Sequence, residues 1–230
     1  YSDLLNAVGV GNSLMSLTNF DDVYWGSSTG LPQAIEPSKG NDILISRNGQ
    51  DVLTLWDSYQ GMHNSSSVDL IQNVAIDGYG DTNQIEGFRF FESAYNEPFY
   101  FTGDSTDSVI QSWGARDVIT GGIGNETYGI YEYGISYDLM TGQVTDEDGS
   151  LRATLSNIEN IYSDGPVSVI GNNNDNIVFA HSPKGGLFSG NGGNDSLVFT
   201  RGLVSPETVF DGGPGVDSIY VYAPVSEIEI

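Results

Sequence analysis

The residues whose chemistry is clearest lie near the end of the chain, at 211–220. From Gly212 the sequence runs Gly-Gly-Pro-Gly-Val-Asp-Ser-Ile-Tyr, so glycines lead to one carboxylate and one large apolar side chain. Glycine adopts positive φ angles at little cost, and a turn built from it can direct several carbonyl oxygens to one side. Ca²⁺ takes about 6–8 oxygen ligands from carbonyls and carboxylates. One turn supplies too few oxygens, and the pattern therefore predicts stacked turns that share a calcium ion.

The same nonapeptide pattern recurs towards the N-terminus with increasing departures. Residues 190–198 carry Asn in place of the second Gly, and residues 121–129 carry Glu in place of Asp. In two further pairs the acids stand nine residues apart: Asp42 and Asp51, and Asp117 and Glu126. Each copy ends in a short strand with one inward apolar residue, which can be buried only against the coils before and after it. Repetition of this kind is typical of a solenoid or array.

The turn glycines and acids of these copies are the candidate calcium ligands. Asp107 and Asp175 are included as degenerate copies. The full set is Gly40, Asp42, Gly49, Asp51, Asp107, Asp117, Gly121, Gly122, Gly124, Glu126, Gly171, Asn173, Asp175, Gly190, Gly193, Asp195, Gly212, Gly213, Gly215 and Asp217. In the alternative interpretation the acids only cap turns and strand ends.

Spacing predicts how the last turns are arranged. In a flattened roll each coil takes two nonapeptides, and Asp175, Asp195 and Asp217 stand 20 and 22 residues apart. We therefore expect these acids on one edge of the roll, with ordinary turns on the other edge. Two ions would then fit, one between turns 171–175 and 190–195 and one between turns 190–195 and 212–217.

These residues resemble the RTX, or haemolysin-type, calcium-binding repeat proteins. The intact motif is at 212–220, near-intact copies are at 190–198 and 121–129, and weaker ones cover 37–54 and 102–120. The resemblance implies a secreted bacterial protein that is exported unfolded by type I secretion machinery and folded by extracellular calcium. RTX repeats occur in toxins, proteases, lipases, epimerases, adhesins and surface-layer proteins, so the repeat does not name an activity.

Short runs of Val, Ile, Tyr and Phe bounded by Gly, Asn, Asp and Ser predict an all-β fold, a parallel β-roll or β-solenoid of stacked short strands. The best helix candidate is 2–17. A longer period of 65 to 68 residues separates Asp42, Asp107 and Asp175. It predicts one continuous solenoid in four parts: residues 1–36 packing on or capping the roll, RTX-like segments 37–101 and 102–169, and C-terminal repeats 170–230.

The amino-acid composition argues against several classes of binding partner. The chain of 230 residues has 31 acidic and 7 basic residues, a formal charge of −24 and no cysteine. That charge argues against nucleic acid and anionic membrane surfaces as partners, and no apolar run is long enough for a transmembrane helix. The start at Tyr1 and the strand-like last residues predict a fragment or a processed product.

Catalytic signals are weak. His63 and His181 are the only histidines, and no G-x-S-x-G motif is present. The acids are too numerous for any carboxylate pair to stand out. Trp25, Trp56 and Trp113 could stack on sugar rings or fill the roll.

We therefore expect a calcium-binding structural or adhesive region of a secreted or cell-surface protein, in a surface layer, matrix or adhesin. Self-association and contact with polysaccharide or a cell surface stay open as roles. The alternative is the accessory region of a secreted carbohydrate-active or hydrolytic enzyme.

Overall fold

The computed structural model describes residues 14–29, 31–55, 64–93, 97–113, 116–164, 168–181, 186–201 and 207–222. The chain divides into two compact units, residues 1–124 and 125–230, which are described one at a time. Every regular element in the described ranges is a β-strand, so the predicted all-β class is confirmed. Within those ranges no helix is long and apolar enough to cross a membrane. The helix expected at 2–17 is wrong over Leu14–Ser16, which form a strand; its earlier residues lie outside the described part.

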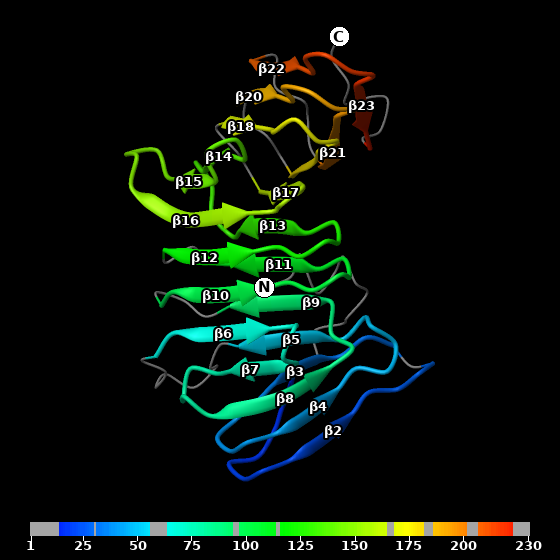
Figure 1. The fold of residues 1–230 in the computed structure, drawn as a ribbon, viewed down its shortest axis with the longest axis vertical. Helices are drawn as coiled ribbons and strands as arrows, with labels where there is room; N and C mark the ends of the chain where they lie inside the picture. The colour runs from blue at the N-terminus through cyan, green and yellow to red at the C-terminus, as the bar shows by residue number, and fades with distance from the viewer. Residues whose placement is uncertain are drawn as a thin grey trace. The chain divides into compact units, whose positions relative to one another are not determined.

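Unit 1 is built from two sheets, A and B, of short and mostly parallel strands (Figure 1). Sheet A has the order β1 (Leu14–Ser16), β3 (Ala34–Glu36), β5 (Val52–Leu55), β9 (Phe90–Ser93) and β11 (Val109–Ser112). Sheet B has the order β2 (Val23–Trp25), β4 (Ile43–Ile45), β8 (Thr82–Glu86), β7 (Val74–Ile76), β6 (Ser66–Asp69), β10 (Phe99–Thr102) and β12 (Asp117–Thr120). The chain passes from one sheet to the other and back, which is the winding of a β-solenoid.

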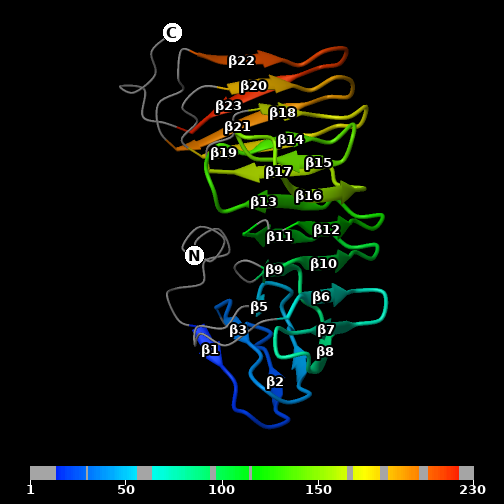
Figure 2. The same cartoon turned by 90° about the vertical axis from the view of Figure 1, so that its left-hand side faces the viewer.

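Unit 2 repeats this architecture. Its A sheet has the order β13 (Thr127–Ile130), β17 (Asn160–Ser163), β19 (Ile177–His181), β21 (Ser196–Arg201) and β23 (Ser218–Val221). Its B sheet has the order β16 (Leu151–Ser156), β15 (Gln143–Thr145), β14 (Ser136–Asp138), β18 (Ser168–Ile170), β20 (Gly186–Ser189) and β22 (Thr208–Asp211). Figure 2 shows β18, β20 and β22 stacked, with their turns above one another at one edge.

The core of each unit consists of stacked apolar side chains at equivalent positions of neighbouring strands. In unit 1, Ile35, Leu53 and Phe91 are aligned across sheet A and are completely buried. In unit 2, Tyr137, Val169 and Phe188 are aligned across sheet B and are almost completely buried. Burial of each such side chain contributes roughly 1.5–3 kcal/mol. One apolar residue per strand therefore suffices when neighbouring coils supply the rest of its contacts.

Each unit departs from parallel winding at one place. In sheet B the segments β6–β7–β8 and β14–β15–β16 are antiparallel meanders. The first reversal of each begins with an Asp that accepts backbone N–H groups, Asp69 from Gln72 at 3.0 Å and Asp138 from Thr141 at 3.0 Å. Such Asx turns reverse the chain locally. The parallel roll was predicted, but these meanders were not.

The second reversals are also alike. Gly80 donates to the carbonyl of Asp77, and Gly149 donates to the carbonyl of Asp146, each at 3.0 Å. Both glycines have positive φ, 88° and 84°. The acidic stretch 146–149 is therefore the tip of a hairpin between β15 and β16, with no flanking helix.

The meanders explain part of the long period. Residues 84–88 and 155–158 leave the last strand of each meander through a left-handed residue, Gly87 (φ 77°) or Asn157 (φ 51°). Residues 17–22 join β1 to β2 directly and belong to no meander. The long period therefore has two structural copies in the described chain, and the division into four segments stays a prediction.

Candidate metal-binding turns

Three turns on one edge of unit 2 form the candidate site. They join β18 to β19 (residues 171–176), β20 to β21 (190–195) and β22 to β23 (212–217), each passing from sheet B to sheet A. The strands on both sides pair in parallel register, so the turns are stacked (Figure 2). The sequence-based expectation that these turns share an edge is correct.

An inner ladder of hydrogen bonds joins the residues that directly precede the A strands. Since Ile177 pairs with Ser196 and Ser196 with Ser218, the equivalent residues are Asn176, Asp195 and Asp217. The N–H of Asn176 donates to Oδ1 of Asp195 at 2.8 Å, and the N–H of Asp195 donates to Oδ1 of Asp217 at 2.9 Å. Each carboxylate therefore uses one oxygen to hold the preceding turn.

An outer ladder lies one residue earlier and runs in the opposite direction. The N–H of Asn194 donates to Oδ1 of Asp175 at 2.7 Å, and the N–H of Val216 donates to Oδ1 of Asn194 at 3.0 Å. Asp175, Asn194 and Val216 are exposed. The outer ladder therefore tightens the stack at the surface, whereas the inner ladder is mostly buried.

The register corrects two of the predicted copies by one residue. Asp175 was matched to Asp195, but the structure places Asn176 at that position. In unit 1, Asp107 was matched likewise, but Ser108 directly precedes β11 and Ile110 is the buried apolar residue. A shift of one residue turns a strand's side chains to the other face, and here the buried residue decides the register.

Asp195 is the carboxylate most sharply placed for a cation. Its side chain is only 3 % exposed, and Oδ2 is buried with no hydrogen-bond partner in the described part of the chain. Burial raises the pKa of Asp195, the Asn176 N–H lowers it, and the carboxylates of Asp217 and Asp175 raise it further. A buried carboxylate in this state is stabilised by a proton or by a cation.

Oxygen atoms converge where the turn glycines lack a side chain. Oδ2 of Asp195 and the carbonyl oxygen of Gly212 both border the position where a Cβ on Gly190 would stand, the latter at 2.6 Å. A cavity of about 20 Å³ is lined by Asp195, Asn176, Gly190 and core residues. This is room for one water-sized particle.

Amide groups bridge the coils in the preceding turn. Nδ2 of Asn191 donates to the carbonyl oxygen of Gly171 at 2.7 Å, and Nδ2 of Asn176 donates to the carbonyl oxygen of Glu159 at 2.8 Å. The residue after the first glycine of the next turn is Gly213, which has no side-chain amide to donate to the carbonyl oxygen of Gly190. Side-chain amides therefore donate to the carbonyl oxygens of Gly171 and Glu159, whereas position 213 carries no side chain that could do so for Gly190.

Unit 1 carries a second pair of ladders, on the edge that leads from sheet A to sheet B. Asp22 donates its N–H to Oδ1 of Asp42 at 2.9 Å, and Asp42 donates its N–H to Oδ1 of Asn83 at 2.9 Å. Asn41 donates to Asp21 at 3.0 Å in the outer ladder. Asp42 is 1 % exposed, and its Oδ2 is buried with no hydrogen-bond partner among the described residues.

The hairpin turn of the first meander brings more carboxylates to this edge. Oδ2 of Asp81 accepts the N–H of Gly40 at 2.9 Å, and buried Asp77 accepts Nδ2 of Asn83 at 3.0 Å. Burial raises the pKa of both Asp42 and Asp77; nearby acids add to this, and N–H donors oppose it. Asp42 therefore resembles Asp195 in burial, ladder position and unpartnered oxygen.

Asp51, Asp117 and Glu126 occupy the equivalent ladder position but differ from Asp42 and Asp195 in their further contacts. Asp51 is buried and uses both oxygens, accepting the Gln33 N–H at 3.0 Å and the Tyr24 hydroxyl at 3.3 Å. Asp117 is buried and accepts the Phe99 N–H at 3.0 Å, on the edge opposite Asp107.

Glu126 is buried in unit 2, and its N–H donates to the Glu159 carboxylate at 3.0 Å. The structure thus distributes the predicted ligands over several edge positions, and it gathers the strongest copies in the turns at 171–217.

The remaining predicted glycines serve close packing. A Cβ on Gly122 or Gly124 would overlap the backbone at Asp104 or Thr106, and Gly40 and Gly49 have φ of 118° and 68°. Gly121 lies in the same turn as Gly122. Asn173 is exposed at its turn tip, and Gly193, Gly213 and Gly215 stack on the turn before them.

Sequence reasoning missed Asn176, Glu159, Asp77 and Asp81. The sequence did not distinguish Asn176 from Asp175, because Ile177 and Val178 are both apolar and only the strand register aligns Val178 with buried Leu197. Asp77 and Asp81 carry no repeat pattern and reach the edge only through the meander. His63 and Trp56 lie outside the described residues.

Two comparisons with known proteins give no relative. No protein-family model matches the chain, and no curated protein matches it. Among the described residues, no group of three or more His, Cys, Asp or Glu side chains is arranged to hold a metal ion. A cation at these turns would therefore depend mainly on backbone carbonyl oxygens.

Proposed function

We propose that the chain is a calcium-binding structural region of an RTX-type protein, secreted or displayed at a cell surface, in which Ca²⁺ fastens the edge of the solenoid. The observation that carries the proposal is the buried Oδ2 of Asp195, which has no hydrogen-bond partner in the described part. Asp195 is also among the residues that line a cavity of about 20 Å³. Type I secretion and a role in a surface layer, matrix or adhesin belong to the same proposal.

The donor set suits calcium. Oδ2 of Asp195 and the carbonyl oxygen of Gly212 converge above Gly190, and Asp217 lies in the adjoining turn. Carboxylate and carbonyl oxygens are the ligands that Ca²⁺ prefers, whereas Zn²⁺ prefers nitrogen and sulfur. The formal charge of −24 also favours bound cations, because self-repulsion opposes a compact fold.

Calcium binding would make the stability of the fold depend on calcium concentration, by mass action. An ion that binds only the folded coil stabilises it by an amount that grows with ion concentration, about 2.7 kcal/mol at 100 times Kd. A chain of this kind is therefore less stable where calcium is scarce and more stable where calcium is abundant.

The test is a calcium titration by calorimetry, together with circular dichroism melting in calcium and in chelator. The wild-type chain should bind Ca²⁺ and melt at higher temperature in calcium. Asp195→Asn should lose the tightest site, since the amide offers one neutral oxygen. The matched control is Asp175→Asn, which makes the same change on the outer ladder and should bind normally. A wild-type chain that melts identically in calcium and chelator would contradict the proposal.

A further inference from the structure

The outer face of sheet B in unit 1 carries apolar side chains that the core does not use. Trp25 is 64 % exposed and Val23 is 60 % exposed on β2, and Ile43 on β4 is 39 % exposed. These side chains alternate with the buried Tyr24 and Leu44, so they point outwards. Trp25 thus does not fill the roll. Exposed apolar surface that is contiguous and bordered by polar groups often marks an interaction site.

A groove crosses this face. It has a volume of about 460 Å³, within the range of ligand sites, and its lining includes Ile43, Ile45, Gln84, Glu86 and Asn73. One wall is the turn between β6 and β7, where the carbonyl of Asn73 accepts the N–H of Ile85 at 2.9 Å. The groove therefore results from the meander.

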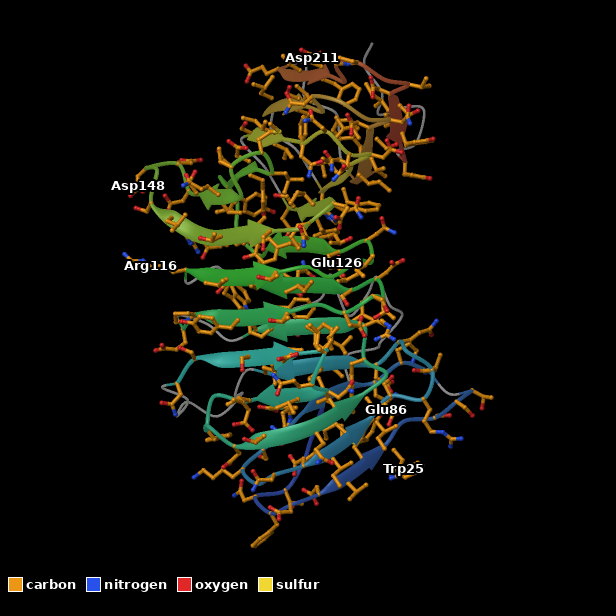
Figure 3. All side chains as sticks on the ribbon, viewed as in Figure 1. Trp25, Glu86, Arg116, Glu126, Asp148 and Asp211 are labelled. Carbon is orange, nitrogen blue, oxygen red and sulfur yellow. The ribbon has the colours of Figure 1, made fainter. Side chains whose placement is uncertain are left out.

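Register places Trp25 and Glu86 in one row across the sheet and Gln84 in the adjacent row. Trp25 is aligned with Ile45, and Ile45 with Glu86, while Ile43 is aligned with Gln84. Neighbouring strands lie about 4.8 Å apart, so the row from Trp25 to Glu86 spans on the order of 10 Å. Figure 3 shows Trp25 and Glu86 at the carboxyl ends of β2 and β8, at the same end of the sheet.

The side chains of Gln84 and Glu86 are available to hydrogen-bond a ligand. The side chains of Gln84 and Glu86 are exposed and make no hydrogen bond to any described residue. Gln84 offers both donors and an acceptor, and Glu86 offers acceptors. A flat aromatic ring on the same face as the amide and carboxylate groups, about 10 Å from Glu86, suits a chain of sugar rings, each with an apolar C–H face and hydroxyl groups that both donate and accept.

Charge selects among possible occupants. The chain carries −24, and Glu86 adds a negative charge to the groove itself. A polyanion and a second copy of the chain would both be repelled. We propose that this face binds a neutral polysaccharide, with Trp25 stacking on a sugar ring and with Gln84 and Glu86 hydrogen-bonding its hydroxyl groups.

The test is affinity electrophoresis of the whole chain, in calcium, through gels containing xyloglucan, mixed-linkage β-glucan, laminarin or dextran. At least one of these glycans should retard the wild-type chain. Trp25→Ala and Gln84→Ala should weaken the binding by about tenfold or more, the loss expected for one good contact. Because the side chains of Trp25 and Gln84 are both exposed, the two variants should melt at the wild-type temperature.

The matched control is Tyr133→Ala, which removes an aromatic side chain that is 65 % exposed in unit 2, and it should be retarded like the wild type. A fifth gel contains the anionic glycan alginate; retardation only by alginate, or by none of the glycans, would overturn the proposal. So would equal retardation of the wild type and Trp25→Ala. Self-association that Trp25→Ala abolishes, without binding to a neutral glycan, would assign the face to a second copy.

Discussion

The backbone N–H of Asp195 donates a hydrogen bond of 2.9 Å to Oδ1 of Asp217 and thereby joins two turns that are 22 residues apart in the sequence. The N–H of Asp22 meets Oδ1 of Asp42 in the same way, also at 2.9 Å. In both units one oxygen of the carboxylate accepts a hydrogen bond from the backbone N–H of a neighbouring coil. In Asp42 and Asp195 the second oxygen is buried without a partner among the described residues. Folding alone therefore does not satisfy these side chains.

Asp217→Ala should weaken calcium binding and the fold more than Asp107→Ala. Asp217 is the acceptor for Asp195, and its removal leaves that buried N–H unpaired, which costs about 1–3 kcal/mol. Asp107 is exposed and lies one residue away from the inner ladder position. Urea denaturation in chelator and calorimetric titration with calcium measure the two effects. Equal losses in the two variants would contradict the ladder assignment.

Asn176→Asp should add a calcium site and make the chain more dependent on calcium. Nδ2 of Asn176 donates to the carbonyl oxygen of Glu159 at 2.8 Å and to Oδ1 of Asn172 at 3.2 Å. A carboxylate there turns two donor contacts into facing oxygens, which should destabilise the chelated protein by roughly 1–3 kcal/mol or more.

Calcium should reverse that loss, and titration should show one more bound ion than in the wild type. The control is Asn174→Asp, which makes the same charge change at an exposed position of the same turn. A similar destabilisation of both variants, or an unchanged number of ions, would count against the site.

The sequence predicted the all-β winding and the shared edge of the last turns, because glycine-rich turns and single apolar residues recur at a regular spacing. It misplaced the copies at Asp107 and Asp175 by one residue, since an acid stands next to the position that the strand register selects. It could not predict that the meander brings Asp77 and Asp81 to the edge near Asp42. Such a contact depends on three-dimensional pairing rather than on a local pattern.

The stacked turns should tolerate no side chain at Gly213. Gly213 and Gly149 have nearly the same φ, 81° and 84°, but a Cβ on Gly213 would overlap the carbonyl oxygen of Asn191, whereas a Cβ on Gly149 has nothing within 4 Å. Gly149→Ala should cost about 1 kcal/mol through backbone strain alone. Gly213→Ala should cost roughly 1–3 kcal/mol more, because the turns must separate. Thermal melting compares them directly, and equal shifts would show that the turns are not in close contact.

Stability should change with pH in opposite directions with and without calcium. Burial raises the pKa of Asp42, Asp77 and Asp195 in the folded chain above the unfolded value of about 3.9. The folded state then binds more protons than the unfolded state, so the chelated protein should gain stability as the pH falls from neutrality towards roughly 4. In calcium the ionised carboxylates are the ligands and protons compete with the ion, so stability should fall over the same range. Asp195→Asn should reduce the slope of both curves, because the residue no longer titrates. Urea midpoints measured across this pH range provide the test. Parallel curves with and without calcium would show that these carboxylates do not bind the ion.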